Sequence, residues 1–404
     1  MIELTEDQKK ADELIVKWFQ KSKRQVFVLA GYAGTGKTTL VRHTVTETLK
    51  LVPDKSVAFV TPTGKAATVL IRSGTPASTL HKLIYQSIVR TEEVQVAGKT
   101  LKVDKLIFVR RESIDEDIKL IVLDEASMVS DEVLQDICRF GVKVIVCGDP
   151  AQLPPVEGYG SCLQLPDITL TTIVRQEQDN PIIMLSKRAR DGEPIAYGKY
   201  GNTVQVIPRQ EFYGNRRRKF LLGADQIICG INRTRSQVND EVRKLLGYES
   251  SLPQDGEKLI CTLNNWELFI DPDMRFNLVN GIIGTCYKPF YVKEPDMGFL
   301  YFKPDFLDDI VPEEIPFDTG IFTAGRPNFQ RGDYFQKFNE KGEPVDAFTL
   351  NRFEYGYCIS CHKAQGSEFG NLVIFDESWA FKEDRTKWLY TAITRAKNKL
   401  VIVR

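Results

Sequence analysis

The sequence predicts an α/β protein with two sets of parallel strands, helices on both sides of each sheet, and two β-rich insertions. Near-continuous apolar runs are typical of strands buried on both faces of a sheet, and a first group of them lies at 25–30, 57–60, 119–123 and 142–147. A second group lies at 224–229, 372–375 and 400–403. Two segments, 84–118 and 262–355, lack such runs and carry shorter β-like patterns.

The first domain is predicted to begin with a helix at 5–20. Thr5 can cap its N-terminus, and the apolar side chains share one face, with Leu14, Ile15, Trp18 and Phe19. The strand at 25–30 then runs into a glycine-rich loop. Residues 84–118 alternate apolar and polar side chains around Gly98, which predicts a β-hairpin inserted into this domain.

The second domain is predicted from the strand at 224–229 and the helical segment at 232–246. Residues 262–355 then change character, because glycine, proline, aspartate and aromatic residues separate short β runs such as 284–287 and 298–302. This composition predicts a small β-barrel inserted into the second α/β domain.

The composition limits the kinds of partner and cellular compartment that can be expected for this protein. A chain of 404 residues is long enough for two or three domains. The 54 basic residues balance the 54 acidic ones, so a nucleic-acid site must be a local groove rather than a basic surface. No apolar run reaches the ~20 residues that span a bilayer, and the acidic, amphipathic N-terminus lacks a signal-peptide pattern. Eight cysteines, mostly in apolar runs, fit a reducing compartment, and we expect a cytoplasmic protein.

Residues Gly31–Thr38 match the phosphate-loop pattern G-x-x-x-x-G-K-[ST], after a strand and before a helix. Backbone N–H groups around Gly34, Thr35 and Gly36 are expected to turn onto phosphate oxygens at the helix N-terminus. Lys37 is expected to supply charge to the β- and γ-phosphates, and Thr38 a hydroxyl to Mg²⁺. The pattern therefore predicts an ATP site.

Two further sets of polar residues follow apolar strands. Asp124 and Glu125 come directly after the strand at 119–123, where Asp124 is predicted to hold Mg²⁺ and Glu125 to polarise the attacking water. Gln152, after the next strand, is expected to sense the γ-phosphate or that water. All of these residues follow strands of one predicted parallel sheet.

In order along the chain, these motifs resemble superfamily 1 helicases, most closely the RecD-like and Dda-like branch that moves 5′ to 3′. The resemblance runs over nearly the whole chain. Besides the phosphate loop and Leu123–Ser127, it rests on Leu4–Gln8 (Q motif), Val60–Ala67 (motif Ia), Ser78–Lys82 (Ib), Asp149–Val156 (III), Thr172–Gln176, Ser360–Glu368 (V) and Tyr390–Ala396 (VI).

The resemblance implies two RecA-like domains with ATP in the cleft between them. The first would span 1–170 with a strand-separating pin at 84–118, and the second 171–261 and 356–404 with an SH3-like barrel at 262–355. Arginine fingers would be Arg175 and Arg395. The resemblance adds further nucleotide-binding residues, namely Gln8 for adenine, Thr39, Gly366 and Glu368.

The same resemblance implies a single-stranded DNA track across both domains. Hydroxyl, amide and imidazole groups there would bind phosphates without reading sequence, and its residues would be Thr61, Pro62, Thr63, Lys65, His81, Ser360, His362 and Lys363. The implied partners are single-stranded DNA, junctions with duplex, and single-strand-binding or recombination proteins. The protein is expected to be a monomer. The motifs do not separate replication, recombination, repair and phage replication.

Some points depart from the pattern or stay open. Val174 occupies the position before Arg175, where many superfamily members place an aromatic that stacks on adenine. The sequence around Cys358, Cys361 and His362 also fits a haem-attachment pattern, but motif V accounts for these residues and no exported context supports haem. The leading prediction is an ATP-dependent DNA helicase. The alternatives are a P-loop NTPase that acts on RNA, remodels protein or acts as a kinase, and a module that only holds single strands.

Overall fold

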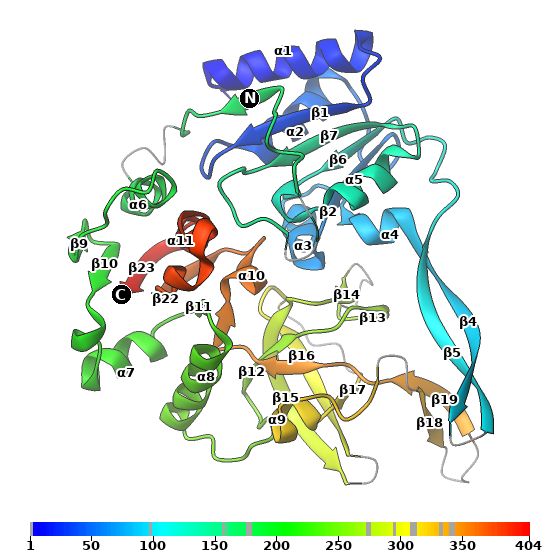
Figure 1. The fold of residues 1–404 in the computed structure, drawn as a ribbon, viewed down its shortest axis with the longest axis vertical. Helices are drawn as coiled ribbons and strands as arrows, with labels where there is room; N and C mark the ends of the chain where they lie inside the picture. The colour runs from blue at the N-terminus through cyan, green and yellow to red at the C-terminus, as the bar shows by residue number, and fades with distance from the viewer. Residues whose placement is uncertain are drawn as a thin grey trace. The chain divides into compact units, whose positions relative to one another are not determined.

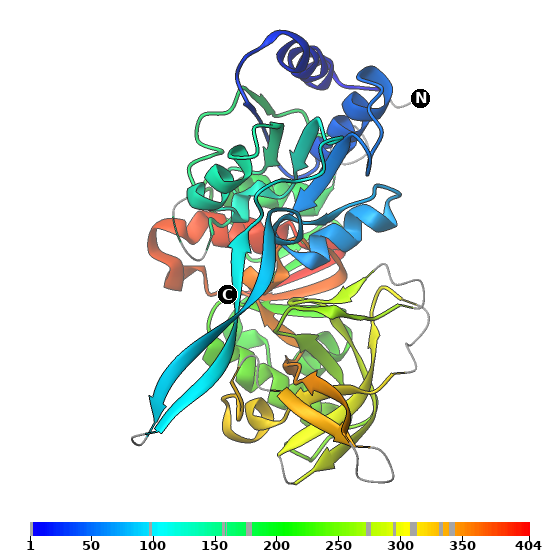
Figure 2. The same cartoon turned by 90° about the vertical axis from the view of Figure 1, so that its right-hand side faces the viewer.

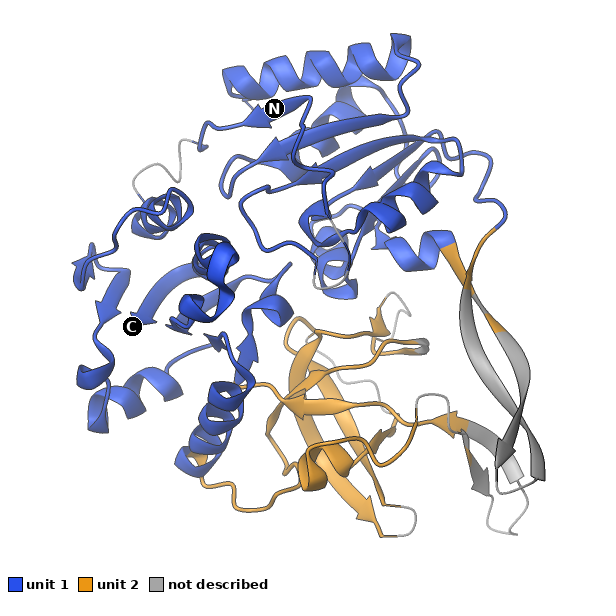
Figure 3. Cartoon of the chain, viewed as in Figure 1, with its two compact units in different colours: residues 1–84, 112–245, 358–404 blue, residues 85–111, 246–357 orange. Residues whose placement is uncertain are grey.

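The computed structural model describes residues 3–96, 99–155, 158, 160–174, 180–271, 276–293, 296–307, 313–330, 334–338 and 344–404. These residues form two compact units (Figure 3): unit 1 holds residues 1–84, 112–245 and 358–404, and unit 2 holds residues 85–111 and 246–357. Unit 1 contains two separate six-stranded sheets. We call the first sheet with its helices the first lobe, and the second sheet with its helices the second lobe.

The sheet of the first lobe is parallel throughout, in the order β3-β2-β6-β7-β1-β8 (Figure 1). Its strands are β1 (Val26–Gly31), β2 (Val57–Thr61), β3 (Ser78–Thr79), β6 (Leu120–Leu123), β7 (Lys143–Gly148) and β8 (Ile168–Leu170). The four central strands are almost wholly buried, as the apolar runs predicted. Their carboxyl ends carry the phosphate loop and the residues at 61–65, 124–125 and 149–152.

Helices cover both faces of this sheet. α1 (Glu6–Lys21) begins at the predicted cap, because the Thr5 side chain accepts from Gln8 and the Gln8 side chain accepts from the Thr5 backbone. α2 (Lys37–His43) continues into a π-helical turn, η1 (Thr44–Thr48). One core joins alternate residues of the strands to α1, α2 and α3 (Gly64–Arg72), with Ile15, Trp18, Phe27, Leu29, Leu40 and Phe59 among its members. α4 (Leu80–Ile84) and α5 (Asp131–Cys138) complete the lobe.

The sheet of the second lobe has the order β21-β11-β22-β23-β10-β9. All its pairs are parallel except β9 with β10. The strands are β9 (Gly198–Tyr200), β10 (Val204–Ile207), β11 (Gln226–Cys229), β21 (Cys358–Ser360), β22 (Phe369–Phe375) and β23 (Ala396–Val403). Its helices are α6 (Pro181–Arg190), α7 (Gly214–Leu222), α8 (Asn232–Leu246), α10 (Cys361–Ala364) and α11 (Arg385–Ile393), with the 3-10 segment η5 (Ser378–Asp384) ahead of α11.

Unit 2 is built around a five-stranded antiparallel sheet, in the order β17-β16-β15-β12-β20. Its strands are β12 (Lys258–Cys261), β15 (Ile283–Val292), β16 (Met297–Pro304), β17 (Ile315–Asp318) and β20 (Phe353–Tyr355). Asn351, just before edge strand β20, accepts from the N–H of Asp318 at 3.0 Å and donates its own to Pro316 at 2.9 Å. The two edge strands are therefore joined, around a core that includes Leu300, Phe302, Phe317 and Phe353.

Smaller elements complete unit 2. They are the strand pairs β13 (Asn265–Phe269) with β14 (Asn277–Leu278) and β18 (Tyr334–Phe338) with β19 (Pro344–Thr349), and the helix α9 (Gly320–Ala324). β12 precedes residue 262, so the five-stranded sheet uses residues on the N-terminal side of the predicted insertion. The SH3-like description stays a prediction.

A β-hairpin lies within the segment predicted for it. β4 (Tyr85–Val96) pairs antiparallel with β5 (Lys99–Arg110), in unbroken register from Tyr85 opposite Arg110 to Val96 opposite Lys99, and forms a long twisted ribbon (Figure 2). Gly98, at the predicted tip, lies outside the described residues. Across the part of the chain that the structure describes, no helix has the length and apolar character needed to cross a membrane.

Candidate functional site: a nucleotide cleft between the two lobes

The phosphate loop connects β1 to α2 in a compact, closed turn. The Lys37 ammonium donates to the carbonyl oxygen of Tyr32 at 3.1 Å, and the Thr35 hydroxyl donates to the same oxygen at 2.8 Å. Gly36 has a φ of 73°, which favours glycine, and directly precedes α2. Three of the predicted phosphate-binding residues, Gly34, Thr35 and Gly36, therefore wrap the N-terminus of a helix.

Gln8 contacts the phosphate loop. Its side-chain N–H donates to the carbonyl oxygen of Thr35 at 2.9 Å, and its side-chain oxygen accepts from the Thr5 N–H at 2.9 Å. A Cβ at Gly36 would lie 2.8 Å from the Gln8 amide nitrogen. Gln8 therefore supports the loop. The predicted reading of adenine would have to use its second N–H and the remaining lone pair on its oxygen.

Two oxygen ligands for a divalent cation meet beside the loop. The Thr38 hydroxyl donates to an Asp124 carboxylate oxygen at 2.7 Å, and the other Asp124 oxygen accepts from the Glu125 N–H at 2.9 Å. A hydroxyl and a buried carboxylate are the hard oxygen donors that Mg²⁺ prefers. The donor set thus fits the predicted metal. Among the described residues, no group of three or more His, Cys, Asp or Glu side chains is arranged to hold a metal ion.

Glu125 is held in a left-handed backbone conformation, with a φ of 54°. A non-glycine residue pays about 1–3 kcal/mol for this conformation, and such strain is concentrated at functional sites. Burial raises the pKa of the Glu125 carboxyl, while the positive charges of Arg395 and Lys37 lower it. A carboxyl with a raised pKa beside two cations is a suitable proton acceptor.

Arg395 faces this cleft from the second lobe. It lies between α11 and β23, is only 5% exposed, and lies close enough to Glu125 for its charge to lower the pKa of that carboxyl. Three contacts fix its guanidinium within its own lobe: it donates to the Thr391 carbonyl oxygen at 3.1 Å, the Ser367 carbonyl oxygen at 3.3 Å and the Thr394 hydroxyl at 3.1 Å. Arg395 therefore lies near Glu125, held by its own lobe, and its role as an arginine finger stays a prediction.

Gln152 is buried in the turn after β7, 6% exposed. Its side-chain oxygen is buried and has no hydrogen-bond partner among the described residues. A buried, unpaired acceptor is costly unless something donates to it. The Gln152 oxygen therefore keeps unused acceptor capacity, and its predicted contact with the γ-phosphate or the water stays a prediction.

A cavity of about 280 Å³ opens beside Thr38, Asp124 and Glu125. Both lobes line it, the first also through Thr39 and Arg42 and the second through Gly366 and Glu368. Gly366 has a φ of 70°, and a Cβ there would lie 3.1 Å from the Ala66 Cβ. The predicted nucleotide residues Thr39, Gly366 and Glu368 are therefore brought together with the phosphate loop.

The predicted DNA-track residues lie at matching places in the two lobes. In the first lobe, Thr61 ends β2 and donates to the Thr63 carbonyl oxygen at 2.8 Å, Pro62 follows, and Thr63 caps α3. In the second lobe, Ser360 ends β21 and caps α10, which contains His362 and Lys363.

Lys65 of the first set also contacts the second lobe. The Lys65 ammonium lies 5.0 Å from the ring centroid of Phe369 in the second lobe. The side chain of His81, in α4, is exposed. Burial lowers the pKa of the half-buried His362.

Some predicted residues cannot be placed. Arg175 and Gln176 lie outside the described residues, as does Val156 at the end of the stretch resembling motif III. Val174 is described, and its N–H donates to the Gly34 carbonyl oxygen at 2.9 Å. An aliphatic side chain therefore lies against the phosphate loop where an aromatic residue is common.

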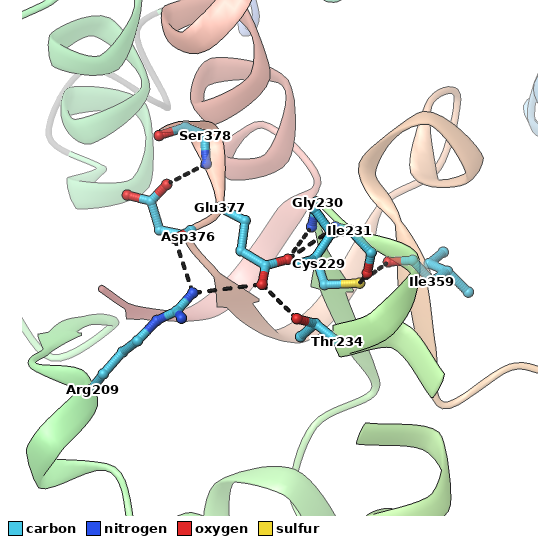
Figure 4. Close-up of polar contacts among 9 residues, drawn as sticks. All are labelled: Arg209, Cys229, Gly230, Ile231, Thr234, Ile359, Asp376, Glu377 and Ser378. Atoms are coloured by element: carbon cyan, nitrogen blue, oxygen red, sulfur yellow. Dashed lines mark hydrogen bonds and ion pairs between the residues drawn. The ribbon is translucent and has the colours of Figure 1, made fainter. Parts of the chain in front are cut away.

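Sequence reasoning did not single out Glu377, a buried carboxylate in the second lobe (Figure 4). It is 1% exposed and accepts hydrogen bonds from the N–H groups of Gly230 at 2.9 Å and Ile231 at 3.0 Å and from the Thr234 hydroxyl at 2.5 Å. Arg209 lies 3.6 Å away. Glu377 thus ties the end of β22 to the turn from β11 into α8. The available signal was the acidic pair that follows the apolar run at 372–375.

Tyr390 is the second residue that sequence reasoning left without a role. It begins the stretch resembling motif VI, yet its hydroxyl contacts the first lobe at Ala33 and Asp149. The signal was a phenol hydroxyl among the mostly apolar residues 388–393 at the C-terminal end of α11.

Two family models match this chain. Residues 3–207 match the family described as the AAA domain, and residues 355–403 match the UvrD-like helicase C-terminal domain. The ATP-dependent RecD2 DNA helicase of Deinococcus radiodurans is 24% identical over 94% of this chain and 47% of its own length. The ATP-dependent DNA helicase RRM3 of Saccharomyces cerevisiae is 28% identical over 89% of this chain and 52% of its own. This chain spans about half or less of the first curated relatives that it matches.

Solved structures show the fold. Pif1 helicase from Candida albicans aligns with a TM-score of 0.55 at 16% identity, over 100% of this chain and 95% of that one. Pif1 helicase from Bacteroides, in complex with ADP-AlF3 and single-stranded DNA, aligns with a TM-score of 0.54 at 18% identity, over 100% and 92%. The two lobes are two RecA-like domains, and the chain belongs to the AAA-domain family and to the superfamily 1 helicases of the RecD/Pif1 type.

Proposed function

We propose that this chain is an ATP-dependent DNA helicase that moves 5′ to 3′ on single-stranded DNA and unwinds duplex. The observation that carries the proposal is the meeting of two lobes at one cleft. The first lobe supplies a phosphate loop, a cation site and an acidic proton acceptor, and the second supplies a buried guanidinium opposite them. A site divided in this way can be assembled only when the lobes approach one another.

The chemistry proposed is hydrolysis of the γ-phosphate of ATP. A water attacks phosphorus, the bond to ADP breaks, and Glu125 accepts the proton of the water. Lys37 and Arg395 offset negative charge on the transferred group, and Gln152 orients the water. In known NTPases, an arginine supplied from a second body raises turnover by about 10³–10⁵.

Mg²⁺ would be held by Thr38 and Asp124. When bound, it neutralises charge on the β- and γ-phosphates. Thr39, Gly366 and Glu368, which line the cavity, would contact the rest of the nucleotide, and Gln8 the adenine.

For the track, we propose that residues 61–65 and 360–363 bind DNA phosphates from the two lobes, with His81 beside them. Hydroxyl and backbone groups at helix N-termini bind phosphate without reading sequence. When the cleft closes, the two sets approach each other, and the strand advances by one step per ATP. The β4–β5 hairpin would be the pin that separates strands, and the sheet of unit 2 would be an SH3-like barrel.

We further propose a monomer that works in the cytoplasm on single strands and their junctions with duplex, alongside single-strand-binding or recombination proteins. Eight free cysteines support a reducing compartment. The names of relatives that act in DNA unwinding support the choice of DNA over RNA.

ATP turnover with and without oligo(dT) tests the proposal. We expect single strands to stimulate turnover. Lys37→Ala should abolish both turnover and unwinding while leaving DNA binding nearly intact, because the phosphate loop is separate from the track. Lys17→Ala, on the exposed face of α1, is the matched control and should behave like the wild type.

Two results would reject the helicase function. Turnover unaffected by DNA would favour an NTPase that acts on protein, and stronger stimulation by RNA would favour an RNA motor. Unwinding that survives Lys37→Ala would exclude the mechanism. Duplexes with 5′ or 3′ single-stranded tails decide polarity, since only the 5′-tailed substrate should be opened.

A further inference from the structure

One hydroxyl from the second lobe bonds to two nucleotide-site segments of the first lobe. Tyr390, in α11, is 1% exposed. The N–H of Ala33, in the phosphate loop, donates to the Tyr390 hydroxyl at 2.8 Å, and that hydroxyl donates to a carboxylate oxygen of Asp149, after β7. The phosphate loop and the turn that contains Gln152 are therefore connected through one oxygen atom of the opposite lobe.

Neighbouring contacts hold the same turn. The Leu153 N–H donates to the Thr391 hydroxyl at 2.9 Å, and the Gln365 side chain donates to the Leu153 carbonyl oxygen at 3.1 Å. Both partners belong to the second lobe. The turn that contains Gln152 is thus bound by α11 and by the segment resembling motif V.

A separate contact reaches the phosphate loop from α6. The Arg190 guanidinium lies 3.9 Å from the ring centroid of Tyr32, the residue before Ala33. Arg190 ends α6, a second-lobe helix that packs against α11. Two consecutive loop residues, Tyr32 and Ala33, are therefore held by two adjoining second-lobe helices.

From this arrangement we propose that Tyr390 is a positioning residue that couples the phosphate loop to the 149–152 turn and transmits the nucleotide state to the second lobe. The inference rests on the proposed function and deepens it. It assigns coupling to a neutral hydroxyl, separate from the charge that Arg395 supplies.

The chemistry of the hydroxyl suits this role. Burial and the neighbouring Asp149 raise the pKa of Tyr390, so the phenol keeps its proton and can accept from Ala33 while donating to Asp149. Asp149 is 1% exposed, and a buried carboxylate depends on each of its donors. Since phosphate loops bind phosphates through their backbone N–H groups, a movement of α11 that pulls on Ala33 changes the loop that holds the nucleotide.

Tyr390→Phe removes both hydrogen bonds and retains the ring. We expect kcat for DNA-stimulated ATP turnover to fall about ten- to hundredfold, the range expected when a buried charged acceptor loses a donor. KM for ATP should change by less than about threefold, because Lys37 and Thr38 are untouched. The matched control is Tyr200→Phe, which removes an exposed second-lobe hydroxyl that donates to the Ala196 carbonyl oxygen at 2.8 Å. It should match the wild type.

The same link is tested from the first lobe by Asp149→Asn, which removes the carboxylate charge and replaces one of its two acceptor oxygens with an N–H donor. This variant should also have a lower kcat and a nearly unchanged KM for ATP. The kcat of the double variant should be no lower than that of the poorer single variant. Wild-type kcat in both variants overturns the proposal. So does a parallel loss of kcat, ATP affinity and hydrogen-exchange protection in α11, which would indicate a purely structural role. A wild-type enzyme that DNA does not stimulate rejects the proposed function instead.

Discussion

Glu377→Ala should loosen the first turn of α8 without disturbing the first lobe. Three donors meet this carboxylate: the N–H groups of Gly230 and Ile231 and the Thr234 hydroxyl (Figure 4). The two N–H groups lie in the turn just before α8, and Glu377 is the acceptor that the structure gives them. Alanine leaves two partly buried amides without this acceptor.

The magnitude follows from these contacts. A hydrogen bond to a charged group contributes about 1.5–3 kcal/mol, and each amide left buried and unpaired costs about 1–3 kcal/mol. Because these terms overlap and are not additive, we expect about 3–4 kcal/mol for Glu377→Ala. The Arg209 side chain is 51% exposed, so its ion pair adds little. Glu377→Gln keeps an acceptor for both amides and should cost about 1–2 kcal/mol.

Hydrogen exchange is the suitable assay, because a chain with two compact units has no single unfolding transition to measure. At about 1.4 kcal/mol per tenfold change, local opening around residues 226–240 should become about 10²- to 10³-fold more frequent in Glu377→Ala. Glu377→Gln should lie about tenfold above the wild type. Peptides from β6 and β7 are the internal reference and should not change. If alanine leaves exchange at 226–240 at the wild-type rate, our account of the cluster is refuted.

Three further predictions concern the cleft and the hairpin. Arg395→Ala should lower kcat about 10³-fold with a modest change in KM, measured by steady-state turnover, whereas a large rise in KM at normal kcat would contradict the finger assignment. Glu125 must be ionised to accept a proton and burial raises its pKa, so turnover should fall with decreasing pH at a value above the ordinary 4.5. Because the Arg395 charge lowers that pKa, the acid limb of Arg395→Ala should move to higher pH, and an unmoved limb would mean that the two groups do not interact. Replacing the hairpin beyond the Thr91–Asp104 pair by a tight turn should impair unwinding more than DNA-stimulated turnover, and equal losses would exclude a pin.

The positions of the buried strands could be predicted from the sequence, for a physical reason. A strand covered by helices on both faces must be apolar at every position, so β1, β6 and β7 appear in the sequence as unbroken runs. The helix α1 was equally accessible, because its cap and its apolar face are local features. The start of the unit 2 sheet was not accessible. β12 is itself an apolar run, and only its antiparallel pairing with β15 and β20 separates it from the strands of the second lobe.

The residues of the cleft could be predicted where the functional side chains are neighbours in the sequence. Lys37 and Thr38 belong to one loop and Asp124 and Glu125 to one strand end, and the parallel sheet brings the two together. The resemblance supplied Arg395, and the structure places it opposite Glu125. Gln8 shows the limit of this reasoning. Its motif indicates contact with a nucleotide, but its bond to Thr35 could not be read from spacing.

The contacts that sequence reasoning missed join residues far apart in the chain. Tyr390 is 357 residues from Ala33 and 241 from Asp149, and Glu377 is 147 from Gly230. A pattern in one sequence reports periodicity and local spacing. Neither of these depends on a partner that lies in the other lobe or follows another strand. Residues of this kind can be suspected only as polar groups in apolar surroundings, where burial requires a partner that the local sequence does not contain.

The contacts between the two lobes also divide into two physical kinds. Tyr390, Thr391 and Gln365 are uncharged side chains that act through hydrogen bonds. These require contact, so they respond to a shift of a few tenths of an ångström. Arg395 acts on Glu125 through charge, which falls off slowly with distance inside a protein. Gain or loss of a γ-phosphate therefore changes the energy of the cleft mainly through Arg395. The hydroxyl and amide contacts instead transmit the geometry of the phosphate loop to the second lobe. On this reasoning Arg395→Ala and Tyr390→Phe should differ in kind. The first removes transition-state stabilisation and leaves the lobes linked, and the second leaves the charge in place and weakens the link between ATP turnover and movement along the strand.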